Sequence, residues 1–247
     1  MTSKGQITKI ASRDGVDARV VERDYVLVHA VALISAHDTD RTLIFKGGTS
    51  LRLLHFEQYR YSADLDYSVV AGSAEQAREL IRGALAQKLP DTIKQLELTE
   101  DGIAFVGPLG ASRTIKLDLA DDELVGNTEQ RPLLQRWADT PGCNVVAYTK
   151  LEIAAEKLRC ILQRRQCRDF LDLDLLLGER DLVATVDLFA RRRHIAGWTP
   201  PRSRRNSRSA STTTRAVGMR SSISIWGRCR TSTGSSAMSG ERCERRG

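Results

Sequence analysis

The sequence predicts an α+β fold, in which a mixed sheet with helices is followed by a helical part and a disordered basic tail. Two patterns predict the sheet. The β-prone residues 42–46 end at a Gly-Gly pair and lead into a helix, and residues 64–70 and 113–119 alternate between two faces with a period of two. A third pattern predicts the helical part, because apolar residues from 149 to 162 recur at helical spacing.

Periodicity and capping signals predict the remaining elements. Residues 17–37 carry a broad apolar stripe, typical of a helix packed under a sheet. Ser73 and Gln76 form a capping-box pattern that opens a helix to about residue 88, which Pro90 ends. Further strands are expected at 94–98 and 103–106, and further helices at 51–56, 169–177 and 181–189.

Composition separates the tail from the rest of the chain. From Arg191 onward, 14 arginines and two glutamates give a charge of +12, so the +7 of the whole chain leaves −5 for residues 1–190. The high pI therefore describes the tail, and it is no argument for nucleic-acid binding by the folded part. We expect residues 1–140 to form an α/β domain, 141–192 a helical part that completes a cleft, and 193–247 the Arg/Ser-rich tail.

Two interpretations of the tail stay open. It has no sustained period of either kind, and its Ser, Arg, Thr and Gly content is typical of a segment that cannot bury enough surface to fold. Because the change falls suddenly within a helical pattern, a shifted reading frame or an eroded terminus explains it. The alternative is a functional RNA-binding arm, since basic tails bind phosphate backbones.

The apolar stretches, cysteines and histidines of the chain disfavour membrane proteins, disulfide-rich proteins and zinc proteins. The longest apolar stretch, 26–36, is far shorter than the roughly 20 residues of a transmembrane helix, and no signal-peptide pattern opens the chain. The five cysteines include no CxxC, and the four histidines have no metal-ligand spacing, which disfavours a disulfide framework and a zinc site. We expect a cytoplasmic protein with no membrane partner.

The strongest functional signal joins a glycine turn to paired carboxylates. Gly47 and Gly48 lie between a strand and a helix, where the backbone can approach a phosphate closely. Asp64 and Asp66 share one face of the next strand, and Asp118 lies on a later strand of matching alternation. At about 4 Å and an effective dielectric near 20, two carboxylates repel by about 4 kcal/mol, so a cation is their natural partner.

This combination is typical of phosphoryl transfer from an NTP, with one or two Mg²⁺ or Mn²⁺ ions as cofactor. Each piece alone is weak, because Asp-x-Asp is common in surface loops and Gly-Gly-Thr is usually only a turn. Their order and spacing are more specific. A Walker-type ATPase is excluded, because its motif is missing and Lys46 precedes the glycines.

The motifs resemble those of a known family. The runs Lys46-Gly-Gly-Thr-Ser-Leu-Arg52 and Tyr61-Ser-Ala-Asp-Leu-Asp-Tyr-Ser68 are similar to the first motif of the nucleotidyltransferase AbiEii/AbiGii toxins, which include the MenT-like toxins. The similarity continues through Lys116-Leu-Asp118, the helix 149–159 and Arg168-Asp-Phe-Leu-Asp172. It covers roughly residues 40 to 180, in the family's motif order, whereas the Arg/Ser tail departs from the family's pattern.

The resemblance implies a polymerase-β-like nucleotidyltransferase that acts as the toxin of a type IV toxin–antitoxin pair, opposed by an AbiEi-like antitoxin. Relatives transfer nucleotides from an NTP to the 3′ acceptor end of tRNA and so block translation. The motif positions imply roles for individual residues. Asp64, Asp66 and Asp118 would bind Mg²⁺, Lys150 and Asp172 would join them as catalytic residues, and the nucleotide would be held by Lys46, Gly47, Gly48, Thr49, Ser50 and Ser62.

Other interpretations of these residues remain. Lys150 is equally a solvated helix residue, and Arg168 with Asp172 forms a possible surface pair at i,i+4. Ser62 either shapes the turn into the strand or accepts a phosphoryl group. Two other functions follow: a phosphotransferase that uses the same site, and a nonenzymatic RNA-binding module that acts through the basic tail.

Overall fold

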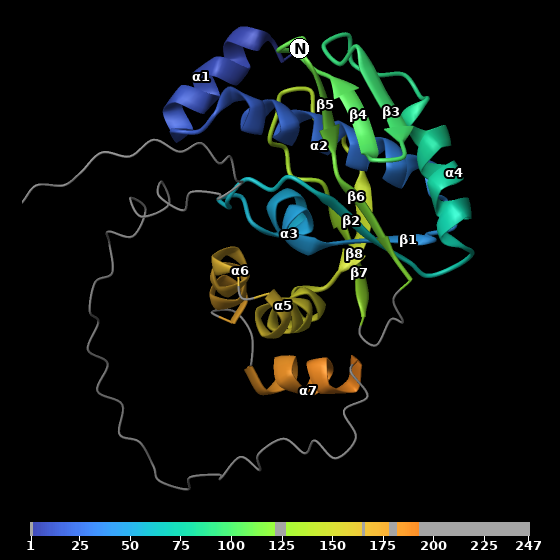
Figure 1. The fold of residues 1–247 in the computed structure, drawn as a ribbon, viewed down its shortest axis with the longest axis vertical. Helices are drawn as coiled ribbons and strands as arrows, with labels where there is room; N and C mark the ends of the chain where they lie inside the picture. Colours follow the sequence, from blue (N-terminus) through green and yellow to red (C-terminus); the bar gives the residue numbers. More distant parts are fainter. Residues whose placement is uncertain (1, 122–126, 165, 178–181, 193–247) are drawn as a thin grey trace, which may run out of the picture. The chain divides into compact units, whose positions relative to one another are not determined.

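A computed structural model describes residues 2–121, 127–164, 166–177 and 182–192 (Figure 1). All of them belong to the first of the two compact units into which the chain divides, Met1–Ser203. The predicted tail, 193–247, lies outside the described residues, so its disorder stays a prediction. Within the described residues, no helix combines the length and the apolar character that crossing a membrane requires.

The main sheet is mixed and has five strands in the order β6-β2-β1-β8-β7. β1 pairs antiparallel with β2 and parallel with β8, while β2 pairs parallel with β6 and β7 pairs antiparallel with β8. The predicted mixed sheet is therefore confirmed. Its strands are β1 (Leu43–Lys46), β2 (Leu65–Val69), β6 (Leu117–Ala120), β7 (Thr128–Pro132) and β8 (Asn144–Tyr148).

A second, three-stranded antiparallel sheet contains β3 (Gln95–Thr99), β4 (Gly102–Val106) and β5 (Ser112–Ile115). The prediction of one continuous strand over 113–119 is wrong, because the chain changes sheets at Lys116. Residues up to Ile115 pair with β4, and those from Leu117 pair with β2. Gly102 lies at this crossing, and a Cβ there would lie 2.2 Å from the carbonyl oxygen of Ile115.

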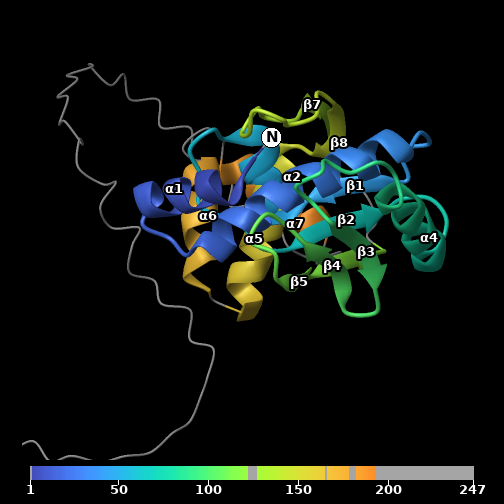
Figure 2. The same ribbon diagram turned by 90° about the horizontal axis from the view of Figure 1, so that it is seen from above.

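The larger core lies between the main sheet and α2 (Ala18–His37), a helix whose middle is almost completely buried. Asp17 caps its first turn by accepting a hydrogen bond from the Arg19 amide. α1 (Lys4–Asp14) and α4 (Ala74–Leu85) pack beside it, as the view from above shows (Figure 2). The predicted capping box at Ser73 and Gln76 is confirmed.

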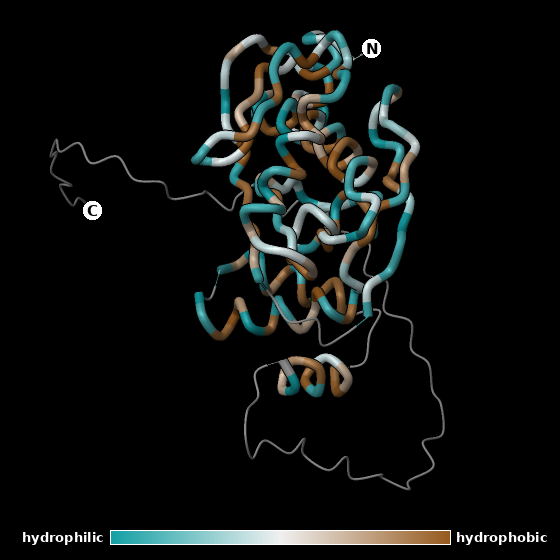
Figure 3. The backbone as a smooth tube through the Cα atoms, turned by 90° about the vertical axis from the view of Figure 1, so that its right-hand side faces the viewer, coloured by the Kyte–Doolittle hydropathy of each residue, from teal (hydrophilic) through white to brown (hydrophobic). Residues whose placement is uncertain are grey.

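A smaller core lies near α5 (Lys150–Arg164), which contacts β8, α6 (Cys167–Leu177) and α7 (Leu182–Arg192). It contains Ile44, Leu51, Tyr148, Ile153, Ala154 and Leu176. These helices alternate between apolar and polar residues, as the lower part of Figure 3 shows. Each predicted helix of this part is present, and its bounds differ from the expected ones by only a few residues.

The Gly-Gly motif forms a short helical turn between the sheet and the loop that leads to β2. α3 (Gly47–Ser50) continues into a π-helical turn, Leu51–His55. A π-helical turn is rare and often lies at a functional site. The predicted helix at 51–56 therefore exists, but it is wider than an α-helix.

Candidate functional site

A cavity of about 500 Å³ opens between the face of β1, β2 and β6 and the helices α5 and α6. Its lining has three aspartates on the strand side, beside Lys46 and Lys116, and mostly basic side chains on the helix side, with Glu156 among them. The acidic wall comes from the strands and their flanking residues, and the basic wall comes mainly from the helices. We define the acidic wall as Asp64, Asp66 and Asp118, and the basic wall as Arg60, Lys157, Arg159, Arg164 and Arg168.

Sheet register brings the acidic wall together. Asp66 on β2 is the register partner of Lys46 on β1 and of Asp118 on β6, so three neighbouring strands place these side chains on one face. Asp64 precedes Asp66 by two residues and lines the same cavity. The intervening residues of β2, Leu65 and Tyr67, face the larger core, which confirms the predicted alternation.

The pKa of Asp66 is raised above its ordinary value. Burial is the largest cause, and the charges of Asp64 and Asp118 raise it further. Lys46 and Lys157 partly offset the rise. The carboxylates of this wall therefore repel one another across the cavity, which is the electrostatic situation that a bound cation would relieve.

The two glycines of the turn differ in how strictly they are required, because only Gly47 has a backbone conformation that favours glycine. Gly47 has a φ of +76°, which few other residues adopt, and a Cβ there would lie 2.2 Å from an Asp66 carboxylate oxygen. A Cβ on Gly48 would lie 2.8 Å from Nη2 of Arg60 and 3.2 Å from Oγ of Ser62. The missing side chains bring the backbone of the turn close to both walls of the cavity.

The next two residues of the motif support the turn from behind. Thr49 and Ser50 are completely buried and do not line the cavity. The Thr49 hydroxyl donates a hydrogen bond to the backbone carbonyl of Asp64, which ties the turn to the start of β2. We therefore assign Thr49 to holding the acidic wall in place, whereas the sequence motif implied a direct role in nucleotide binding.

Lys150 and Asp172 also lie outside the lining of the cavity. Nζ of Lys150 lies 4.3 Å from the ring centroid of Phe56, a cation–π contact. Asp172 is 1% exposed and forms ion pairs with Arg60 and Lys157. The interpretation of Arg168 and Asp172 as a surface i,i+4 pair is wrong, because Asp172 is buried and its partners are Arg60 and Lys157.

Sequence reasoning missed most of the basic wall. Arg60 and Lys157 can be recognised as site residues only by their contacts with Asp172. Asp172 is 112 residues from Arg60 in the chain, so the sequence does not show this pairing. The only local signals were the flanking motifs, because Arg60 immediately precedes the Tyr61-to-Ser68 run and Lys157 lies within the 149–159 helix. Lys116 also lines the cavity, and its Nζ lies 3.6 Å from a carboxylate oxygen of Asp118.

The acidic side chains of the cavity do not form a preassembled metal site. Within the described residues, no group of three or more His, Cys, Asp or Glu side chains is arranged closely enough to hold a metal ion. The acidic wall is thus not a closed coordination cage. The chemistry of the donors still fits a hard divalent cation, because carboxylate oxygens are its preferred protein ligands and Asp66 is destabilised as an anion by its neighbours.

Comparison with known families decides the class of protein. The family described as "Nucleotidyl transferase AbiEii toxin, Type IV TA system" matches residues 30–216, most of the chain. The chain belongs to the AbiEii nucleotidyltransferase toxin family. As a member of this family it is an enzyme, a nucleotidyltransferase, and the resemblance seen in its motifs is confirmed.

A solved structure of a nucleotidyltransferase toxin has a similar fold. MenT4, a nucleotidyltransferase toxin from Mycobacterium tuberculosis H37Rv, has a TM-score of 0.65 at 20% identity, over 77% of this chain and 70% of that one. The antibiotic-resistance factor ANT(2″)-Ia matches with a TM-score of 0.44 at 15% identity, over 69% of this chain and 93% of that one. No curated protein sequence matches this chain.

Proposed function

We propose that this AbiEii-family chain transfers a nucleoside monophosphate from an NTP to RNA, at the 3′ acceptor end of tRNA, with Mg²⁺ as cofactor. Transfer to that end would block translation and explain toxicity. A type IV system implies an antitoxin partner, which we propose to be AbiEi-like, and we place the reaction in the cytoplasm with the tRNA.

The observation that carries this proposal is the meeting of Asp64, Asp66 and Asp118 with the Gly47-Gly48 turn in one cavity. Asp66 lies between Lys46 and Asp118 in the sheet, so its position is fixed by backbone hydrogen bonds on both sides. Strands hold side chains more rigidly than loops do, and nucleotidyl transfer depends on such positioning. Asp66 and Asp118 on neighbouring strands, with Asp64 directly before β2, therefore support catalysis better than the same residues in a surface loop would.

Each group has a role in the proposed reaction. Asp64, Asp66 and Asp118 would hold Mg²⁺, which when bound neutralises charge on the triphosphate and on the leaving pyrophosphate. The backbone of Gly47 and Gly48 and the Ser62 hydroxyl would contact phosphate. The acceptor hydroxyl forms a bond to the α-phosphorus and releases its proton to water, while the bond to the β-phosphate oxygen breaks and pyrophosphate leaves with the electron pair.

A second candidate function rests on Ser62. Its hydroxyl lines the cavity two residues before Asp64, so it is a potential acceptor of the terminal phosphoryl group of an NTP. In that reaction the Ser62 oxygen bonds to the γ-phosphorus, NDP leaves with the electron pair and the hydroxyl proton passes to water. The two functions differ in which phosphorus atom is transferred: the α-phosphorus to RNA in nucleotidyl transfer, and the γ-phosphorus to Ser62 in phosphotransfer.

The test uses purified full-length protein, Mg²⁺, total tRNA and each of the four NTPs labelled at the α or the γ phosphate. Nucleotidyl transfer predicts α-label in tRNA with the wild-type chain, and none with Asp66→Ala. Label from γ-NTP in the protein, lost in Ser62→Ala, would indicate the phosphotransferase. Equal α-labelling of tRNA by wild type and Asp66→Ala, or none with any NTP, would contradict the leading proposal.

A further inference from the structure

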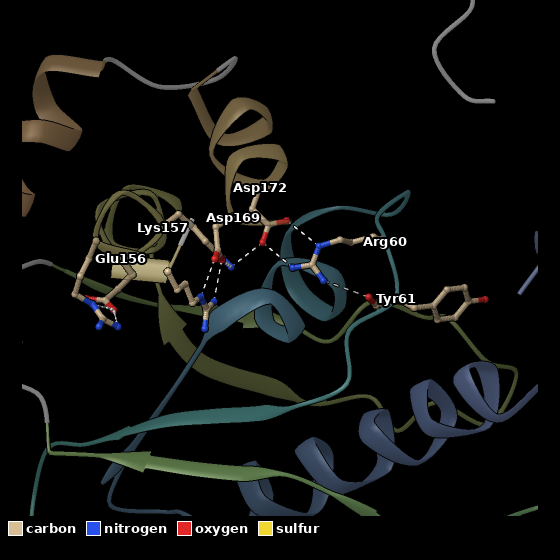
Figure 4. A network of polar contacts seen from close by, with 8 residues as sticks. Arg60, Tyr61, Glu156, Lys157, Asp169 and Asp172 are labelled. Carbon is tan, nitrogen blue, oxygen red and sulfur yellow. Dashed lines mark hydrogen bonds and ion pairs between the residues drawn. The ribbon is translucent and has the colours of Figure 1, made fainter. Parts of the chain in front are cut away.

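The chain between residues 60 and 66 presents every second side chain to the cavity. The residues of this stretch that line it are Arg60, Ser62, Asp64 and Asp66. Figure 4 shows two neighbours: the Arg60 side chain points toward Asp172, and the Tyr61 ring points away from it. Asp66 belongs to β2, but residues 56–64, all of them described, form neither helix nor strand. Contacts outside regular secondary structure therefore have to hold this alternation.

Arg52 holds this stretch from outside the cavity. Its Nη1 donates to the Tyr59 carbonyl at 2.6 Å, and its Cζ lies 3.9 Å from the centroid of the Tyr61 ring, a cation–π contact. Its other donors, Nε and Nη2, bind the carboxylate of Asp24 in α2. The Arg52 side chain is only 7% exposed, so it ties the stretch to a helix of the larger core.

The backbone of Arg52 lies in the π-helical turn, whose carbonyl groups accept hydrogen bonds from two arginines outside it. Arg131, in β7, donates from Nε to the Leu54 carbonyl at 3.1 Å. Arg136, which follows β7, donates from Nε and Nη2 to the Arg52 carbonyl and from Nη2 to the Phe56 carbonyl, at 2.7 Å. The last carbonyls of a helix have no partner within it, so these contacts fix where the turn ends and the loop begins.

Arg136 occupies an unfavourable place for a cation. Its hydrogen bonds in the described part of the chain all go to backbone carbonyls. Burial, followed by the charge of Arg52, lowers the pKa of Arg136 to about 10. A cation in such a place is better accounted for by the two carbonyls that it holds than by a general contribution to stability. We call Arg52 and Arg136 the arginine clamp.

We propose that the two residues of the arginine clamp are positioning residues for nucleotidyl transfer. Arg136 fixes the end of the π-helical turn, the turn fixes Arg52, and Arg52 holds the loop so that the residues from Arg60 to Asp64 keep their alternation. Neither arginine lines the cavity, so both act through the backbone that they hold. The assignment rests on the proposed function, in which Asp64 binds Mg²⁺. A misplacement of about 1 Å in such a site costs about 10²-fold in rate.

Arg136→Ala tests the clamp, and Arg131→Ala is its matched control. Both arginines donate to carbonyls of the same turn, but Arg131 binds Leu54 within it and Arg136 binds Phe56, where the loop begins. Misalignment affects the transition state more than ground-state binding, so kcat should fall about tenfold in Arg136→Ala while KM for NTP changes by less than about threefold. In Arg131→Ala we expect kcat to change by less than about twofold. Assays run well below each melting temperature exclude a loss of folded protein.

The contact between Arg52 and the loop is tested at Tyr61, because Arg52 itself pairs with the buried Asp24 and its loss endangers folding. Tyr61→Leu removes the ring that lies over the guanidinium. Tyr61→Phe, the conservative variant, keeps the ring and loses only the hydrogen bond from the hydroxyl to Asp14. We expect the fall in kcat in Tyr61→Leu, and recovery of most of it in Tyr61→Phe.

Hydrogen exchange of the backbone amides of residues 57–63, followed by mass spectrometry, measures the loop directly and needs no substrate. Exchange should be about tenfold faster in Tyr61→Leu and Arg136→Ala, because the loop opens more often once its contacts are lost. It should stay near the wild-type rate in Tyr61→Phe and Arg131→Ala.

Equal losses of kcat in Arg136→Ala and Arg131→Ala, or wild-type exchange in both Tyr61→Leu and Arg136→Ala, would overturn the assignment. The exchange result is independent of transfer. If the wild type labels no RNA but these two variants selectively speed exchange of the loop, the clamp stands and the proposed function fails. If transfer occurs and kcat is unchanged in folded variants whose loop exchanges faster, the positioning role alone is wrong.

Discussion

The two walls of the cavity contain acids that behave in opposite ways. Asp66 of the acidic wall is surrounded by like charges and its pKa is raised, first by burial and then by Asp64 and Asp118. Asp172 behind the basic wall is buried as well, but its hydrogen bonds from Arg60 and the charge of Lys157 outweigh the effect of burial, and its pKa is lowered. Asp66 as an anion therefore lowers the stability of the ligand-free enzyme, whereas Asp172 as an anion raises it.

This contrast separates residues kept for chemistry from residues kept for architecture. An acid that stabilises the free protein is accounted for by its contribution to the fold. An acid that destabilises the free protein is better accounted for by a ligand that it binds. Removing each kind of charge should accordingly change activity and stability in different proportions. The following predictions use that difference, from the largest expected effect to the smallest.

Asp66→Asn should have the largest effect on activity. We expect loss of labelling of about 10²–10³-fold or more, because the substitution removes the central charge of the acidic wall. In EDTA the same variant should melt at a higher temperature than the wild type, since repulsion with Asp64 and Asp118 disappears. A variant that loses activity and also melts earlier would show that Asp66 is a structural residue.

Asp172→Asn should have the largest effect on stability. Breaking a buried ion pair leaves Arg60 without a carboxylate partner and Lys157 with Asp169 alone, and such changes cost about 3–5 kcal/mol of unfolding free energy. The matched control is Asp118→Asn, because the side chain of Asp118 is 56% exposed and its loss should change stability by less than about 0.5 kcal/mol. Chemical denaturation of both variants measures the difference, and equal costs would contradict the division between the walls.

Gly47→Ala should reduce both stability and transferase activity. The left-handed backbone costs about 1–3 kcal/mol for a residue with a side chain, and the new Cβ would displace the Asp66 carboxylate. Gly15→Ala is the matched control, because Gly15 also has a positive φ, +66°, but no atom lies within 4 Å of its Cβ position. Both variants should be destabilised, and only Gly47→Ala should lose transferase activity; full activity in Gly47→Ala would refute the close approach.

The same contrast explains how much of the site could be predicted from sequence. Asp66 lies in β2 and Asp64 lies directly before it, and both alternate with apolar residues, so their common face follows from local pattern. The glycine turn lies only 16 residues before Asp64 and is equally visible. Arg60 and Asp172 meet only in the folded chain. Charged residues on helices are ordinary, and no local pattern says which of them turn inward.

The fold shows a similar limit. The mixed sheet and the helical part were predictable because their periodicities are strong. The break at Lys116 was not, since residues 112–120 continue to alternate although β5 and β6 belong to different sheets. Pairing partners, which are distant in sequence, decide where a strand changes sheets.

Acid should weaken the ion pairs of the basic wall. Burial raises the pKa of Asp169 and Asp172, but their hydrogen bonds from Arg164 and Arg60 and the charge of Lys157 more than offset it, so both pKa values lie below the ordinary 3.8. Groups of this kind contribute stability that is complete above the ordinary pKa and is lost as pH falls through the lowered one. Wild type should therefore lose stability below about pH 4, and Asp172→Asn should lose less over the same range. Equal slopes in a pH series of denaturation curves would refute the linkage.

Lys150→Ala should have the smallest effect on activity. It tests whether the catalytic role that the family motif implies for Lys150 holds in this chain. Lys150 lies outside the cavity lining, and its ammonium lies over the Phe56 ring and not in the cavity. We expect KM for NTP to change by less than about threefold, against about tenfold for Lys157→Ala, whose ammonium faces the cavity from the same helix. A larger effect at Lys150 than at Lys157 would mean that α5 rotates when nucleotide binds. The family motif in the 149–159 helix would then identify the nucleotide-binding lysine better than the ligand-free structure does.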